Sequence, residues 1–252
     1  EGFPSAVSIV SVSDFIAPAL TSFTVTPGAV NVSAAAQVVT CDMTLTDAKS
    51  GVDVATCALS APGLLQFATC DAVAPTSGTR NNGLFSCVAT IPRYARAGTW
   101  TATVYPSDQV GNRANIPSAT TLVVTAAPED TVMPSLVLAA SDFNPKTISV
   151  GAGPKSVVCT MGVADSPAGV DTANCQFISS DFQVQSCTAG APISGTRNNG
   201  TFECTVIIPR YSEGGDWRVQ ANLTDLVGLE STTVFGPRLT VDCAAGELET
   251  TC

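Results

Sequence analysis

Apolar and polar residues alternate along several segments of this chain. In residues 39–45 every second residue is apolar, and residues 157–163 repeat the pattern. A period of two predicts β-strands, because successive side chains of a strand point to opposite faces of the sheet. The residues expected on the buried faces are Val39, Cys41, Met43 and Leu45 in the first segment and Val157, Cys159, Met161 and Val163 in the second.

Short strands and turns fill the rest of each half of the chain. Turns are expected at Pro27-Gly28 and Pro62-Gly63, and a tight turn at Asn81-Asn82-Gly83, where Asn and Gly tolerate the positive φ of hairpin turns. About seven short strands in about 115 residues predict a Greek-key β-sandwich. Further strands of the first half are expected at residues 21–25, 55–59, 66–73, 85–91, 100–104 and 119–125.

The chain is a tandem repeat. The heptapeptide Ser-Gly-Thr-Arg-Asn-Asn-Gly occupies residues 77–83 and recurs letter for letter at residues 194–200, which sets a period of about 117 residues. A repeat of that length is a domain rather than a solenoid turn. We therefore predict an all-β chain with two tandem Greek-key sandwiches, residues 14–127 and residues 128–241.

The two ends of the chain fall outside these repeats. Residues 3–10 align with residues 116–123, the expected closing strand of the first repeat. Residues 1–13 are therefore expected to be the closing strand of a preceding repeat, which either pairs with a neighbouring molecule or lies poorly ordered. Residues 242–252 leave the strand pattern and are expected to begin a Cys-rich tail or module.

Composition narrows the classes of partner. Hydrophobic residues make up 45% of the chain and charged residues 13%, and the net charge is −10. The chain has no cluster of lysine and arginine that could displace counterions from phosphates, which argues against nucleic acid and anionic membrane surfaces. No apolar run approaches the length that spans a bilayer.

Ten cysteines and no histidine favour disulfides over zinc, because Cys/His ligand sets are excluded and no Cys-x2-Cys pair occurs. Each repeat has four cysteines, which allow three pairings. Cys41 and Cys87 lie on inward faces of strands expected to be neighbours in one sheet, which favours bonding within sheets. The predicted bonds are Cys41–Cys87, Cys57–Cys70, Cys159–Cys204 and Cys175–Cys187.

Cys243 and Cys252 in the tail either bond to each other or belong to a further module. Three sequons, at Asn31, Asn199 and Asn222, are candidate glycosylation sites. Together with the disulfides they indicate an extracellular protein.

Acidic residues of several loops are expected to meet at one end of each sandwich. Hard oxygen ligands gathered at a module junction suit Ca²⁺; the alternative is that Asp and Asn simply favour loops. Tighter binding is expected in the first repeat, because Leu229 stands where the first repeat has Asn112. The candidate ligands are Asp14, Asp47, Asp53, Asp108 and Asn112 in the first repeat and Asp130, Asp165, Asp171 and Asp225 in the second.

These residues resemble a known family, the Ig-like and cadherin-like sandwich modules of microbial and algal extracellular surface and filament proteins. The resemblance rests on Asp-x-x-x-Pro openings at Asp14 and Asp130, on Asp-x-x-Ser-Gly-Val at 47–52, on Gly-Thr-Trp-Thr at 98–101 and on Asp-x-x-Gly-Asn at 108–112. It implies Ig-like domains in structural or adhesive proteins, sometimes stiffened by calcium. Trp100 and Trp217 follow the cysteines, unlike the tryptophan of antibody domains.

The function expected is a non-enzymatic structural segment of an extracellular fibre or stalk. Its partners would be other modules or copies of the same fibre, or cell-surface proteins. The alternative is an adhesin or carbohydrate-binding array that holds a glycan with residues 80–83 or with Tyr94. Catalysis is not expected, because no histidine, Gly-x-Ser-x-Gly motif or phosphate-binding loop occurs, although paired carboxylates for glycoside hydrolysis are left open.

Overall fold

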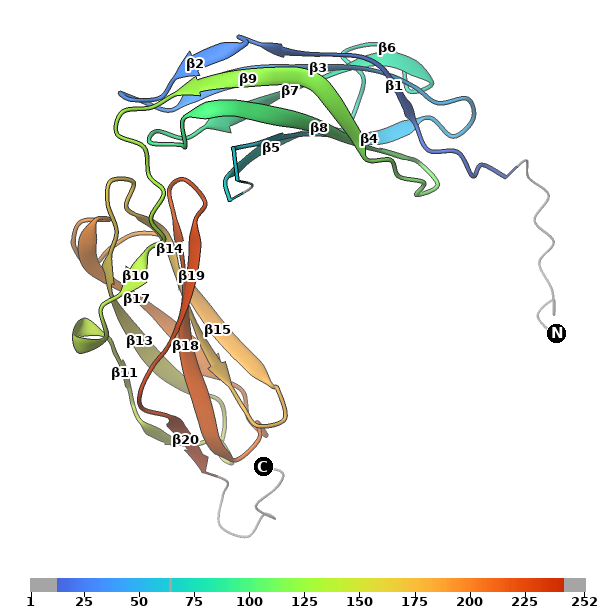
Figure 1. The fold of residues 1–252 in the computed structure, drawn as a ribbon. Coiled ribbons are helices and arrows are strands. Elements are labelled where there is room, and N and C mark those ends of the chain that lie inside the picture. The colour runs from blue at the N-terminus through green and yellow to red at the C-terminus, as the bar shows by residue number, and fades with distance from the viewer. Residues whose placement is uncertain (1–12, 64, 243–252) are drawn as a thin grey trace, which may run out of the picture. The chain divides into compact units, whose positions relative to one another are not determined.

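The computed structural model describes residues 13–63 and 65–242. The chain divides into two compact units (Figure 1). Within the described residues, the first unit contains 13–30, 37–91 and 98–124, and the second contains 31–36, 92–97 and 125–242. Residues 1–12 of the segment 1–13 that was predicted as a closing strand lie outside the described residues, as do residues 243–252, with Cys243 and Cys252.

The first unit consists of two sheets. One has the strand order β1-β3-β7-β6, and the other has the order β2-β9-β8-β4-β5. The strands are β1 Ala19–Thr26, β2 Ala29–Asn31, β3 Gln37–Thr46, β4 Val52–Ser60, β5 Phe67–Ala72, β6 Ser77–Thr79, β7 Asn82–Ile91, β8 Gly98–Asp108 and β9 Ile116–Thr125.

The second unit repeats this plan. One sheet has the order β10-β13-β17-β16 with β11 also paired to β13, and the other has the order β12-β20-β18-β14-β15 with β19 paired to β18. Its elements are β10 Ser135–Leu136, the 3-10 turn η1 Leu138–Ala140, β11 Asp142–Asn144, β12 Thr147–Ser149, β13 Lys155–Ala164, β14 Val170–Ile178, β15 Val184–Ala189, β16 Ser194–Gly195, β17 Asn199–Ile208, β18 Gly215–Asp225, β19 Glu230–Val234 and β20 Leu239–Asp242.

The core of each unit lies between its two sheets. In the second unit, Met161 and Phe202 of one sheet pack in the same buried cluster as Phe177 and Trp217 of the other. The alternating positions predicted for 39–45 and 157–163 are all buried, so both buried faces were predicted correctly. Each large apolar side chain removed from water in this way stabilises the fold by roughly 1.5–3 kcal/mol.

Local structure at the repeated heptapeptide differs from the prediction. The hairpin turn is present, but its two central residues are Arg80 and Asn81, between Thr79 of β6 and Asn82 of β7. Positive φ falls on Gly78, at 81°, rather than on an asparagine. Gly83 is required for another reason, because a Cβ there would lie 2.4 Å from the carbonyl oxygen of Thr79.

The predicted disulfide pairing is wrong. The four bonds are Cys41–Cys57, Cys70–Cys87, Cys159–Cys175 and Cys187–Cys204. The expected strand neighbours are nevertheless correct: Cys41 lies opposite Cys87 on β3 and β7, as Cys57 lies opposite Cys70 on β4 and β5. Each bond instead crosses the interior from one sheet to the other.

Strand geometry accounts for this difference. Side chains of a strand stand roughly perpendicular to their sheet, so neighbouring cysteines of one sheet extend side by side toward the opposite sheet. A cysteine on the facing sheet therefore meets the thiol more directly. The Cα atoms of Cys41 and Cys57 are 6.4 Å apart and those of Cys70 and Cys87 are 5.7 Å apart, within the range that a disulfide spans.

Among the described residues, no helix is long and apolar enough to cross a membrane.

We predict that non-reducing peptide mapping will join Cys41 to Cys57. Cleavage after Lys49, Phe67 and Arg80 separates the four cysteines of the first unit, so each pairing gives distinct linked peptides. The Cys41→Ala/Cys57→Ala double variant should lose roughly 3 kcal/mol of unfolding free energy, because the bond closes a loop of 16 residues. A peptide in which Cys41 is linked to Cys87 would contradict the assignment.

Candidate functional site

The arginine of each heptapeptide fastens a hairpin to two other segments of its own unit. Arg80 Nη1 donates to the carbonyl oxygens of Val52, at 2.6 Å, and Asp53, at 3.2 Å, while Nη2 donates to the carbonyl oxygen of Val73 at 2.9 Å. In the second unit, Arg197 makes the same bonds to Val170, Asp171 and Gly190. The rigid fork of guanidinium donors suits several carbonyls at once.

The asparagine after each arginine secures the neighbouring acidic loop. Asn81 Nδ2 donates to the carbonyl oxygens of Asp47 and Lys49, and Asn198 Nδ2 donates to those of Asp165 and Pro167. Gly51 leaves room for this arrangement, since a Cβ there would lie 2.9 Å from Cβ of Arg80. Residues 80 and 81, expected in one alternative to hold a glycan, are therefore bonded within their own unit.

Tyr94 and Tyr211 occupy equivalent positions with the same unusual backbone. Their φ angles are 68° and 65°, and the guanidinium groups of Arg93 and Arg210 lie 4.3 and 4.4 Å from the respective ring centroids. Tyr94 is half-buried, whereas 57% of Tyr211 is exposed. Of the two, Tyr211 is more accessible to a partner.

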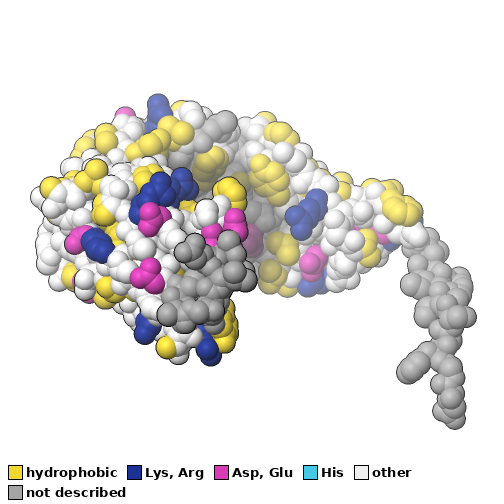
Figure 2. Space-filling model, turned by 90° about the horizontal axis from the view of Figure 1, so that it is seen from below, with side chains coloured by type: hydrophobic (Ala, Val, Ile, Leu, Met, Phe, Trp, Pro, Cys, Tyr) yellow, Lys and Arg dark blue, Asp and Glu magenta, His cyan; other side chains and the backbone are white. Residues whose placement is uncertain are grey.

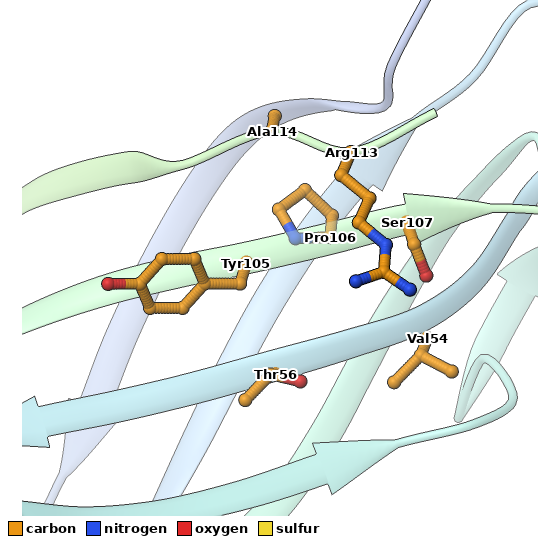
Figure 3. A pocket seen from close by; sticks show the side chains of 7 residues that line it. All are labelled: Val54, Thr56, Tyr105, Pro106, Ser107, Arg113 and Ala114. Atoms are coloured by element: carbon orange, nitrogen blue, oxygen red, sulfur yellow. The ribbon is translucent and has the colours of Figure 1, made fainter. Parts of the chain in front are cut away.

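A hollow of about 440 Å³ lies on the outer side of the first unit's β8 and β4 (Figure 3). Tyr105 of β8, a residue that is 44% exposed, lies at one end of the hollow. Arg113 extends toward the other end, near Val54. Thr56 adds a hydroxyl from β4. An exposed aromatic ring beside polar and cationic groups can contact a flat polar ligand such as a sugar.

Three carboxylates meet in the first unit, as the sequence predicted. Oxygens of Asp14, Asp47 and Asp108 lie within 4.8 Å of one another. Loop N–H groups hold them: Ser50 and Ile16 donate to Asp14, and Lys49 and Gly51 donate to Asp47. We call this group the first acidic cluster.

Asn112 completes the first acidic cluster as a donor. Its Nδ2 lies 2.7 Å from Asp108 Oδ2 and 3.2 Å from the carbonyl oxygen of Asp14, and its backbone N–H donates to Asp108 Oδ1. Both side-chain partners are acceptors, so the amide must present its nitrogen to them. Asn112, predicted as a metal ligand, thus acts here as a hydrogen-bond donor.

In the first acidic cluster the pKa values of Asp14 and Asp108 are lowered. Bonds from the backbone N–H groups of Ser50 and Ile16 lower the pKa of Asp14, and the charge of Lys49 adds to the effect. Burial alone would raise the pKa of Asp108, but the bonds from Asn112 outweigh burial and leave that pKa below its ordinary value. These carboxylates are held in their charged form.

The second acidic cluster consists of Asp130, Asp165 and Asp225, whose oxygens also lie within 4.8 Å of one another. All three are buried, with exposures of 0, 6 and 2%. Asp130 accepts from the N–H groups of Val132 and Ala168, Asp165 from that of Gly169, and Asp225 from those of Val227 and Leu229.

In the second acidic cluster the pKa values of Asp165 and Asp225 are raised. Burial raises the pKa of Asp225 to about 7, although bonds from the N–H groups of Leu229 and Val227 lower it. Burial and the charge of Asp130 also raise the pKa of Asp165. Asp108 and Asp225 occupy equivalent loop positions, and the pKa of this carboxyl is lowered in the first unit and raised in the second.

Two predicted ligands stand apart from these clusters. A carboxylate oxygen of Asp53 lies 3.9 Å from Arg80 Nη1, and one of Asp171 lies 3.5 Å from Arg197 Nη1. Both are ion pairs at the hairpin. Topology gathers the loops, but the direction of each side chain along a strand decides which carboxylates meet.

The sequons differ in accessibility. Asn31 and Asn199 are exposed. Asn222 is half-buried on β18, and its side chain bonds to Asn174 and Thr232. On the face shown in Figure 2, acidic and basic side chains are interspersed with hydrophobic and neutral ones.

No protein-family model and no curated protein matches the chain. Among solved structures, SGBP-B of the Bacteroides ovatus mixed-linkage glucan utilization locus, in complex with a mixed-linkage heptasaccharide, aligns with 16% identity and a TM-score of 0.21. The alignment covers 89% of this chain and 47% of that one, so this chain spans about half of that protein's length.

We predict that Arg197→Lys will lower the unfolding free energy of the second unit by about 1–3 kcal/mol, because one ammonium cannot reach three carbonyls placed for a guanidinium fork. Arg218→Lys, on an exposed position of β18, is the matched control and should change it by less than about 0.5 kcal/mol. Urea unfolding followed by tryptophan fluorescence measures both. Equal effects of the two substitutions would show that the fork is not required.

We also predict opposite pH dependences for the two units in chelator. Because Asp225 has a folded-state pKa raised to about 7 from an ordinary 3.8, its contribution to stability is complete below about pH 4 and is lost as pH rises through 7. The folded-state pKa values of Asp14 and Asp108 are lowered from the ordinary 3.8. These two groups therefore stabilise the first unit at pH values above 3.8, and this contribution is lost as the pH falls through their folded-state pKa values.

Each unit has one tryptophan, so Trp100→Phe and Trp217→Phe variants report the units separately in urea titrations between pH 3 and 8. Asp225→Asn should flatten the profile of the second unit. A second unit that gains stability between pH 5 and pH 8 would contradict the raised pKa.

Proposed function

We propose that the chain is a non-enzymatic structural segment of an extracellular fibre or stalk, built from tandem disulfide-braced modules. The observation that carries the proposal is the internal use of the repeated heptapeptide. In both units its arginine and asparagine bond to backbone carbonyls of neighbouring loops, so the most closely repeated residues hold the module together.

We further propose that each unit is a Greek-key sandwich of the Ig-like type. The order β1-β3-β7-β6 opposite β2-β9-β8-β4-β5 supports this, because strands labelled A, B, E and D form one sheet of an Ig domain and strands C, F and G belong to the other. β12 also pairs in parallel with β20, so a short early strand joins the edge of the second sheet.

An extracellular location follows from the chemistry of the bonds. Four disulfides form and persist in an oxidising environment, such as that of secreted and cell-surface proteins. The absence of a catalytic role is part of the proposal: the carboxylates of both clusters accept hydrogen bonds from loop N–H groups, which favours a role in ordering loops.

The second candidate function is glycan binding at a cell surface. The hollow beside Tyr105 favours it, because an exposed ring, Arg113 and the hydroxyls of Thr56 and Ser107 are groups that contact sugars (Figure 3). For this candidate function we propose the outer face of β4 and β8 as the glycan site, whereas the sequence predicted the loop at residues 80–83 or Tyr94.

We predict that immunogold electron microscopy of the source cells, with an antibody raised against this chain, will label extracellular filaments or stalks along their length. Pre-immune serum is the control. Label confined to the cell interior, or present only on a soluble secreted form, would contradict the structural role.

A glycan array with the intact chain separates the two candidates. A structural segment should show no selective binding, whereas selective binding that Tyr105→Ala removes and Tyr211→Ala retains would replace the fibre role with the glycan-binding one. Tyr211 is the matched control because it is an exposed tyrosine outside the hollow.

A further inference from the structure

A tyrosine packs against a small apolar cluster within the second unit. Residues 92–97, between β7 and β8, belong to this unit. Tyr94 packs there against Ala168, Val227 and Leu229, which are buried with exposures of 6, 2 and 3%. The carbonyl oxygen of Tyr94 accepts a hydrogen bond of 2.7 Å from the N–H of Asp130. One tyrosine thus covers part of an apolar surface that the loops of the second unit form.

The corner that carries Tyr94 is built a second time around Tyr211. Both tyrosines have positive φ, the guanidinium of the preceding arginine stacks on each ring, and Nε of that arginine donates to a carbonyl oxygen of the loop before β3 or β13. Positive φ is unfavourable for a bulky residue and persists where the surrounding structure enforces it. Tyr211 is 57% exposed, whereas Tyr94 is half-buried. The second corner therefore presents the same ring to solvent.

The surface that Tyr94 covers in the second unit has an open counterpart in the first. The residues at the positions of Ala168, Val227 and Leu229 are Ser50, Val110 and Asn112. Val110 is 60% exposed, whereas Val227 is 2% exposed.

Two further apolar side chains lie on the segment next to Val110. Phe15 and Ile16 are 83 and 69% exposed. They follow Asp14, whose carbonyl oxygen accepts a hydrogen bond from Asn112 Nδ2 at 3.2 Å, so this bond joins their segment to the loop of Val110. We call Phe15, Ile16 and Val110 the open apolar surface.

The exposed tyrosine and the open apolar surface have neighbours of opposite charge. The guanidinium of Arg210 lies 4.4 Å from the ring centroid of Tyr211. Asp14 and Asp108, of the first acidic cluster, are close in sequence to the residues of the open apolar surface. Opposite charges orient two surfaces as they meet, and a net charge of −10 opposes contact between copies elsewhere.

We propose that Tyr211 of one copy of this chain docks on the open apolar surface of a second copy, in the way that Tyr94 packs on Val227. A second copy is the partner because it carries the counterpart of the surface that Tyr94 already covers. The contact joins two different surfaces, so it is heterologous and extends from copy to copy instead of closing a pair. The proposal rests on the fibre role and deepens it, since it names the surfaces through which segments meet.

Sedimentation velocity of the intact chain at increasing concentration and low salt tests the contact. We expect reversible self-association that Tyr211→Ala weakens by roughly tenfold or more, because a tyrosine that fills a contact is a typical hot spot. Tyr105→Ala, at another exposed tyrosine, is the matched control and should leave association unchanged. Val110→Asp should weaken association as Tyr211→Ala does, and its control is Val88→Asp, at a valine of β7 that is 59% exposed.

Photocrosslinking identifies the surface itself. A chain with p-benzoylphenylalanine in place of Tyr211 is mixed with isotopically labelled copies, irradiated and digested with trypsin. We expect the residue at position 211 to be joined to the labelled peptide 97–113, which contains Val110. Isotopic labelling separates a contact between copies from one within a chain.

The outcomes distinguish this contact from the fibre role. Antibody-labelled filaments, together with a chain that stays monomeric and gives no crosslink between copies, would leave the fibre role and overturn the contact. Association that Tyr211→Ala leaves unchanged, or crosslinks confined to other peptides, would overturn it as well. Association and crosslinks as expected, without labelled filaments, would support the contact and contradict the fibre role.

Discussion

Covalent bonds across the interior are the constraint on which the rest of each unit depends. Cys41–Cys57 and Cys70–Cys87 tie β3 to β4 and β5 to β7, so both sheets are fixed face to face at the level of the core. The loop between β3 and β4 is then anchored at both ends. That loop holds Asp47 and presents the carbonyls that Asn81 binds, so the hairpin and the acidic cluster both depend on the same fixed pair of strands.

Much of the fold could be predicted because burial follows a period of two. Residues 39–45 show it clearly, and the structure buries the expected residues. β2 and β6 have only three residues each, too few for a period to be read, and they were not predicted. The cysteine pairing failed for a different reason: the sequence indicates that a thiol points inward, but which of three nearby thiols it meets depends on the distance between sheets.

The acidic residues, too, could be predicted from the sequence only in part. Loop topology was sufficient to predict that Asp14, Asp47 and Asp108 converge. It was not sufficient to separate them from Asp53, whose side chain lies beside Arg80. Nor could it show that Asn112 presents its nitrogen to the cluster. The structure also shows that equivalent carboxylates, Asp108 and Asp225, have pKa values shifted in opposite directions where the residues around them differ.

Bridges between consecutive or nearby strands also have a consequence for biosynthesis. The cysteines of each bond are 16 or 17 residues apart, whereas equivalent cysteines of the two units are more than 100 apart. Loop closure is less costly over the shorter separation, so each thiol meets its native partner more often than its counterpart in the other repeat. Tandem modules of this kind can thus form their disulfides within one module at a time as each emerges.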